Sequence, residues 1–220
     1  MLTAANHQAL ENDMLNEQKL KIAEAGFCAQ YPGGFEHPEM IKVGKKHRMD
    51  KMIEFAQASF SKKQCRNIEE TTDNMVKIVS RSSMVSMFEK PKFKDFVNHL
   101  STNEKAFLVD ALSRMLHGKQ QAGFGAMVDL LKIGKLAKWS LVSIIPAYYA
   151  PDTEVFVKPT TAKGIIQYFD INDLIYKPTP SWDFYQAYRR LIDDAKQKVD
   201  KRLSPSNAAF SGFLMMAMKL

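Results

Sequence analysis

The residue types with the clearest chemical potential stand in the stretch "EVFVKPTTAKG", residues 154–164. It is typical of a short strand, a Pro-Thr-Thr turn and the start of a helix. Free N–H groups at a helix start bind phosphate and other anions, and Lys158 and Lys163 would add positive charge. Alternatively, the hydroxyl of Thr160 or Thr161 caps the helix and occupies those N–H groups. The stretch therefore predicts either an anion site or an ordinary capped helix. The glycine-rich phosphate motifs GxxxxGK[ST] and GxGxxG are absent.

A second basic group lies in "KIGKLAK", where Lys132, Lys135 and Lys138 recur every three residues. On a helix they would form a row that could follow a phosphate backbone, and the next residue, Trp139, could stack on a base. The alternative is a solvated helix face with the tryptophan in the core. "KPKFK" offers the same two interpretations, with three lysines around Phe93: Lys90, Lys92 and Lys94.

The charge balance favours a polyanionic partner. The 220 residues carry a net charge of +7. Residues 111–220 hold 15 basic side chains against 9 acidic ones and so supply most of this excess. A basic excess attracts polyanions, nucleic acid above all. The leading hypothesis is non-catalytic binding of nucleic acid through the C-terminal half, and its candidate residues are Lys132, Lys135, Lys138, Lys158, Thr160, Thr161 and Lys163.

The chain shows no recognisable catalytic, metal-binding or cofactor-binding motif. The nucleophile motif GxSxG is absent, and the five histidines do not occur at H-x3-H or HExxH spacing. Adjacent carboxylates such as Glu69 and Glu70 diverge by about 100° on a helix and make a poor acid–base pair. No catalytic, metal or cofactor residue is predicted, and whether the protein is an enzyme stays open.

Hydrophobic periodicity predicts a mostly helical fold. The clearest signal is "STNEKAFLVDALSRMLHG", where Ser101 and Glu104 form a capping box and Gly118 stands at the C-terminal end. The other expected helices are one from Thr3 to Ala25, one from Pro38 to Phe60, one from Asn67 to Ser80, a short one after Pro91, one from Gln121 to Ile133, one after Thr160 and one from Trp182 to Leu203.

The C-terminal third predicts a small α/β element. Val142 to Ile145, Val155 to Val157 and Leu174 to Tyr176 are rich in β-forming residues. The expected architecture is therefore a mostly α, single-domain protein, a helical bundle with two or three short strands. Its expected parts are a helical region (1–138), a small α/β region (139–203) and an apolar C-terminal segment (204–220).

Four stretches together resemble a group of uncharacterised bacterial proteins: "KFKDFVNHLSTNEK", "LAKWSL", "PDTEVFVKPTTAKG" and "SWDFYQAY". Proteins of that group share a Trp before an apolar strand, a Phe-x-Lys-Pro-Thr turn, and a Trp and Tyr that open a late helix. The resemblance covers about the last two-thirds of the chain. It implies one shared fold and a bacterial, cytosolic setting, and it implies no activity, substrate or cofactor.

Two further hypotheses belong to other classes. The apolar tail from Ala208 to Met218 must be buried, either within the chain or against a second copy in a homo-oligomer. The Thr160 turn could instead serve an enzyme that acts on a phosphorylated small molecule. No apolar run reaches the ~20 residues of a membrane-spanning helix, and no secretory signal is recognised at the N-terminus. With only Cys28 and Cys65, no disulfide framework is expected, and we expect a cytoplasmic protein without a membrane partner.

Overall fold

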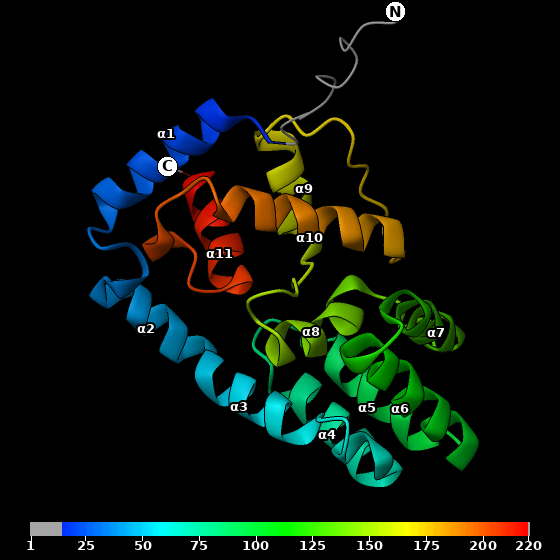
Figure 1. Ribbon diagram of the computed structural model, residues 1–220. Coiled ribbons are helices and arrows are strands. Elements are labelled where there is room, and N and C mark those ends of the chain that lie inside the picture. Colours follow the sequence, from blue (N-terminus) through cyan, green and yellow to red (C-terminus); the bar gives the residue numbers. More distant parts are fainter. Residues whose placement is uncertain (1–14, 220) are drawn as a thin grey trace, which may run out of the picture.

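The computed structural model describes residues 15–219, which form eleven α-helices, three single turns of 3-10 helix and no β-strand (Figure 1). The prediction of a mostly helical protein is confirmed. The predicted small α/β element within residues 139–203 is wrong. The expected helix from Thr3 begins outside the described residues. The helices are α1 (Glu17–Gln30), α2 (Pro38–His47), α3 (Met49–Ser59), α4 (Ile68–Arg81), α5 (Glu89–His99), α6 (Thr102–His117), α7 (Gln120–Ile133), α8 (Trp139–Tyr149), α9 (Pro159–Tyr168), α10 (Trp182–Lys196) and α11 (Asn207–Ala217).

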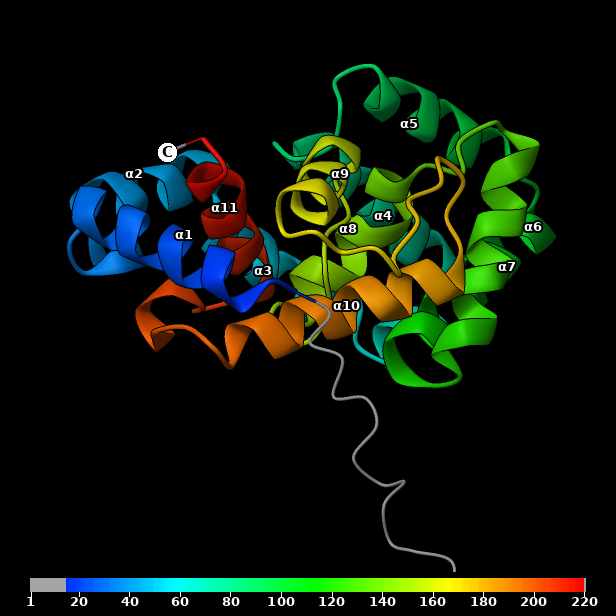
Figure 2. The same ribbon diagram turned by 90° about the horizontal axis from the view of Figure 1, so that it is seen from above.

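The helices pack around one continuous hydrophobic core that draws residues from α1 through α11. Helices α6 and α7 pair along their length as an antiparallel hairpin. Helix α10 crosses the middle of the molecule, with α1 and α11 toward one end and α7 toward the other (Figure 2). Within residues 15–219, no helix is both long and apolar enough to cross a membrane.

The run "SLVSIIPAYY", expected to supply a strand, lies in helix α8. Every residue from Trp139 to Tyr148 is buried, so the helix is surrounded by protein on all sides. A helix in that position needs no polar face. Its lack of 3.6-residue periodicity, together with β-branched residues and Pro146, imitates a buried strand in the sequence. Burial on all sides overrides the modest β propensity of Val142, Ile144 and Ile145.

The second expected strand, Val155 to Val157, is a buried segment without regular structure. Side chains of neighbouring helices, and not a second strand, bond its backbone. The N–H of Val157 donates to the hydroxyl of Ser143 on α8 at 3.0 Å. The hydroxyl of Tyr185 on α10 donates to the carbonyl of Val155 at 3.4 Å. An apolar β-type run can therefore be buried as a single strand-like segment when helices supply its hydrogen-bond partners.

The third expected strand, Leu174 to Tyr176, lies in an irregular connection between α9 and α10. Leu174 is buried, Ile175 is 74% exposed and Tyr176 is half-buried. This alternation imitates a strand with one buried face. No neighbouring strand exists among the described residues, so the alternation here only anchors a loop.

The N-terminal half follows the sequence more closely. Asn67 accepts a hydrogen bond from the Glu70 N–H and caps α4, and the capping box of Ser101 and Glu104 opens α6. The helix expected from Pro38 to Phe60 is instead two helices. The chain takes a left-handed conformation at Arg48 (φ 53°), which ends α2 and starts α3.

The apolar tail forms α11, and its burial is internal. Phe210, Phe213, Leu214 and Ala217 are buried, and the helix packs against α1, α9 and α10. Asn207, fully buried at its start, accepts from Lys196 at 2.6 Å and donates to Asp193 at 3.2 Å. The apolar character of the tail is therefore explained within one chain, which removes the observation that motivated the homo-oligomer hypothesis.

Candidate anion-binding sites

Six of the seven residues predicted to bind anions fall into two separate places, and Lys132 belongs to neither. Helix α9 divides them, because Lys158 and Lys163 are five residues apart and point about 140° away from each other around the helix axis. Lys158 lines a groove between α9 and α11 together with Thr160 and Thr161. Lys163 lies on another face, with its ammonium 5.3 Å from the centre of the Tyr176 ring.

The expected row of Lys132, Lys135 and Lys138 on one helix is wrong. Helix α7 ends at Ile133, so only Lys132 is helical, and it pairs with Asp129 at 2.9 Å. Lys135 takes a left-handed conformation (φ 56°) in the connection, and Lys138 immediately precedes α8. All three lysines are exposed nonetheless.

This connection lies beside α5. A Cβ atom on Gly134 would come within 2.6 Å of the Phe96 ring on α5, so this ring packs directly against the backbone of the connection. The Ser140 hydroxyl donates to the Glu89 carboxylate at the other end of α5, at 2.6 Å. Helix α5, which carries the lysines of "KPKFK", therefore lies beside the connection and the start of α8.

Trp139, at the start of α8, contacts the connection between α9 and α10. Its indole N–H donates to the carbonyl of Lys177 at 2.7 Å, and its ring centre lies 6.5 Å from that of Tyr176. Burial raises the pKa of Tyr176, and Lys163 lies over the same ring. Trp139 is 1% exposed, so it is a core anchor and is not available to stack on a base.

We call the resulting region the basic surface. Figure 2 shows α5 and α9 in the same upper part of the view, with α8 next to α9. The members of the basic surface are exposed, and within residues 15–219 none forms an ion pair with a carboxylate. They are Lys92, Lys94, Lys135, Lys138, Lys163 and Lys177. Lys177 was not predicted, because its position depends on a contact across 38 residues.

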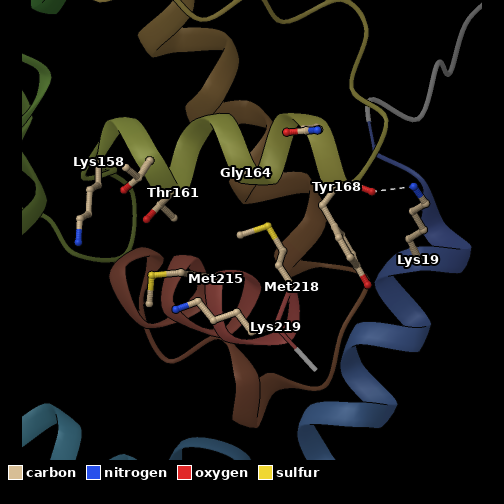
Figure 3. A pocket seen from close by; sticks show the side chains of 10 residues that line it. Lys19, Lys158, Thr161, Gly164, Tyr168, Met215, Met218 and Lys219 are labelled. Carbon is tan, nitrogen blue, oxygen red and sulfur yellow. Dashed lines mark hydrogen bonds between the residues drawn. The ribbon is translucent and has the colours of Figure 1, made fainter.

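The groove between α9 and α11 has a volume of about 630 Å³ (Figure 3). One wall is formed by α9 and the other by the end of α11, where Met215 and Met218 provide an apolar lining. Lys19 of α1 lies at one end, but its ammonium is occupied by the Tyr168 carbonyl and the Asp170 carboxylate, at 2.8 and 2.9 Å. Lys158 at the opposite end has no such partner in the described part of the chain.

No threonine side chain caps the start of α9. Lys158 is the N-cap residue, Pro159 follows, and no side chain accepts a hydrogen bond from the first turn. The first backbone bond runs from the Ala162 N–H to the Lys158 carbonyl at 2.8 Å. The capping interpretation of Thr160 and Thr161 is therefore wrong, and their N–H groups remain outside the helical hydrogen-bond pattern.

A partly buried polar cluster around Glu154 was missed by sequence reasoning. Glu154 accepts from Tyr185 at 2.6 Å, from Gln120 at 2.8 Å and from Arg189 at 2.8 Å. Burial, and then the nearby Glu154 charge, raises the pKa of Tyr185 well above its usual value. Every carboxylate oxygen is thus engaged within the protein. The cluster links α7 and α10 to the segment 154–158 and offers no free group for acid–base chemistry.

The remaining reactive side chains are held apart or occupied. Within residues 15–219, no three His, Cys, Asp or Glu side chains gather in a way that could hold a metal ion. Burial raises the pKa of both thiols, Cys28 and Cys65, which keeps them in the less reactive protonated form. His117 bonds the Phe60 carbonyl at 2.8 Å.

Comparisons with known proteins found no match among family models, curated proteins or solved structures.

Proposed function

We propose that the protein binds nucleic acid through the basic surface, without catalysis. The observation that carries the proposal is the group of six exposed lysines that lack carboxylate partners on α5, the α7–α8 connection, α9 and the α9–α10 connection. Unpaired ammonium groups keep their full charge for a phosphate backbone, and each phosphate contact releases condensed counterions.

The aromatic residues near these lysines argue for backbone binding without base recognition. Trp139 is buried, and one face of the half-buried Tyr176 is covered by Lys163. Lysine binds phosphate as a point charge and carries no sequence information in that contact. We therefore expect binding that depends strongly on salt and little on base sequence.

Fluorescence anisotropy with labelled single-stranded RNA, single-stranded DNA and duplex DNA of mixed sequence tests the proposal. If four to six phosphates are contacted, the slope of log Kobs against log salt should be about −3 to −5. Absence of detectable binding to all three at 20 mM salt would overturn the proposal.

A charge-matched pair of variants locates the binding surface. Substituting Lys135, Lys138 and Lys163 by Gln should weaken binding at low salt at least tenfold and reduce the salt slope by about 2 to 3. The control carries the same change at three exposed lysines of α2, which lies at the other end of the molecule (Figure 2): Lys42, Lys45 and Lys46. Equal weakening by both variants would show that net charge, and not the basic surface, accounts for binding.

A further inference from the structure

We propose that the groove between α9 and α11 is a second, independent site, which binds a single-chain anionic amphiphile by its carboxylate or phosphate head. The head would lie at the start of α9, and the alkyl chain would lie along the two methionines of α11. This site does not depend on the basic surface, because Lys163, the α9 member of that surface, points away from the groove.

The first observation is the free start of α9. The N–H groups of Thr160 and Thr161 have no acceptor in the described part of the chain, and no side chain caps the turn. Unsatisfied N–H groups and the helix dipole favour a negative charge at this point. Lys158 adds a full positive charge beside them.

The second observation is the side chain of Thr161. It is 8% exposed, yet its hydroxyl has no hydrogen-bond partner within residues 15–219. Figure 3 shows it directed from α9 into the groove toward Met215. The hydroxyl is therefore free to donate a hydrogen bond to a ligand in the groove. An anionic oxygen in the groove would accept its hydrogen bond and also those of the first-turn N–H groups.

The apolar lining of the groove indicates that the rest of the ligand is an alkyl chain. Met215 and Met218 form the α11 side of the groove, and Met218 packs over Gly164, where a Cβ atom would lie 3.1 Å from its methyl group. Flexible, polarisable methionine side chains adapt to alkyl chains. From Thr161 to Tyr168 the helix rises about 10 Å, which suits an alkyl chain of about eight carbons. A free phosphate ion would leave this lining uncovered.

Calorimetric titration of the full chain tests the inference with four probes: octyl phosphate, octanoate, inorganic phosphate and octyl glucoside. All are used below their critical micelle concentrations. We expect saturable binding of octyl phosphate and octanoate with 1:1 stoichiometry. Inorganic phosphate and the uncharged octyl glucoside should each bind at least tenfold more weakly. No saturable binding of either anionic amphiphile would overturn the inference, as would inorganic phosphate or octyl glucoside binding as tightly as octyl phosphate.

Thr161→Val separates the proposed role from a structural one. The substitution keeps the shape of the side chain and removes the hydroxyl. Since that hydroxyl has no partner in the protein, the melting temperature without ligand should stay the same or rise. A hydrogen bond to a charged group corresponds to about tenfold or more in affinity, so octyl phosphate should bind about tenfold more weakly. Unchanged affinity in this variant would contradict the proposed head position.

Lys163→Ala is the matched control on the same helix. It should leave the affinity for octyl phosphate unchanged and weaken nucleic-acid binding. Thr161→Val should instead weaken octyl phosphate binding and leave the affinity for nucleic acid unchanged. The two proposals therefore fail separately. Loss of octyl phosphate binding in Lys163→Ala would show that the amphiphile binds the basic surface, against the inference.

Discussion

The α6–α7 hairpin and the segment 154–158 both pack against the core, but different bonds hold them in place. In the hairpin, backbone groups bond within each helix, and the Ser101–Glu104 capping box satisfies the first turn of α6. In the segment, Val155 and Val157 are fully buried without helix or sheet, and their backbone groups bond side chains of α8 and α10. Secondary structure supplies the backbone hydrogen bonds of the hairpin, and side chains of other helices supply those of the segment 154–158.

This difference has a consequence for stability. A helix loses only one bond when a cap is removed, because its interior backbone bonds remain. A segment without regular structure depends on a few side chains from elsewhere in the chain, so removal of one leaves buried polar groups without partners. We therefore expect polar substitutions around the segment to cost more than equivalent substitutions in the hairpin.

The largest loss of stability is expected for Glu154→Ala. It leaves Arg189, Gln120 and Tyr185 without their shared acceptor in a largely buried position. Removing one partner of a buried ion pair destabilises proteins by about 3 kcal/mol or more, and for a chain of this size about 3 kcal/mol corresponds to a melting temperature lower by about 6–12 °C. Calorimetry or circular dichroism at neutral pH would measure the shift.

Asp129→Ala is the control for Glu154→Ala, since Asp129 pairs with Lys132 on an exposed face. Exposed ion pairs contribute about 0–1 kcal/mol. If Glu154→Ala melts within 2 °C of the Asp129→Ala control, apolar packing alone holds the segment and the comparison fails.

A matched pair of serine substitutions gives a smaller, more direct contrast. Ser143 accepts from the Val157 N–H at 3.0 Å and is fully buried. Ser143→Ala leaves that N–H without a partner and should cost about 2 kcal/mol. Ser101→Ala removes an exposed N-cap and should cost about 1 kcal/mol. Urea unfolding of both variants would measure the two costs, and an equal or reversed order would contradict the contrast.

The same contrast explains which parts of the fold could be predicted from sequence. Local signals were sufficient for α4, where Asn67 caps the first turn, and for α6 and α7, where an apolar stripe faces the core. They failed for α8 and the segment 154–158. A run that is buried on all sides carries no periodicity, so the sequence could not separate a strand from a helix or from a segment bonded by side chains.

The candidate sites were predictable only as residue types. The sequence identified Lys158, Thr160 and Thr161 as a helix start with anion-binding chemistry. It could not show that no side chain caps this helix, nor that Met215 and Met218 lie opposite, because that contact spans more than 50 residues. The regular spacing of Lys132, Lys135 and Lys138 suggested a helical row, yet the helix ends between the first and second of them.

The smallest loss of stability is expected at the exposed hydrogen bonds that link the start of α1 to Asp170, just after α9. Asp170 accepts from Lys19 at 2.9 Å and from Asn16 at 3.2 Å, and these bonds lower its pKa below the usual 3.8. A carboxylate with a lowered pKa stabilises the folded state above the unfolded pKa, and this contribution is lost as the pH falls through the folded pKa. Because the link is exposed, we expect a smaller effect than at Glu154.

Asp170→Asn tests this link without disturbing the backbone, because Asn also tolerates the left-handed conformation at this position (φ 56°). The variant should melt below the wild type at pH 7, and the difference should shrink as the pH falls below 3.8, the usual pKa of the carboxyl group. At low pH both proteins are uncharged at this position, so a charge-based link can no longer distinguish them. A difference that is as large at about pH 2.5 as at pH 7, after no loss at all through the acid range, would assign the effect to side-chain geometry. The α1 link would then resemble the segment 154–158, where the positions of hydrogen-bond partners matter more than charge.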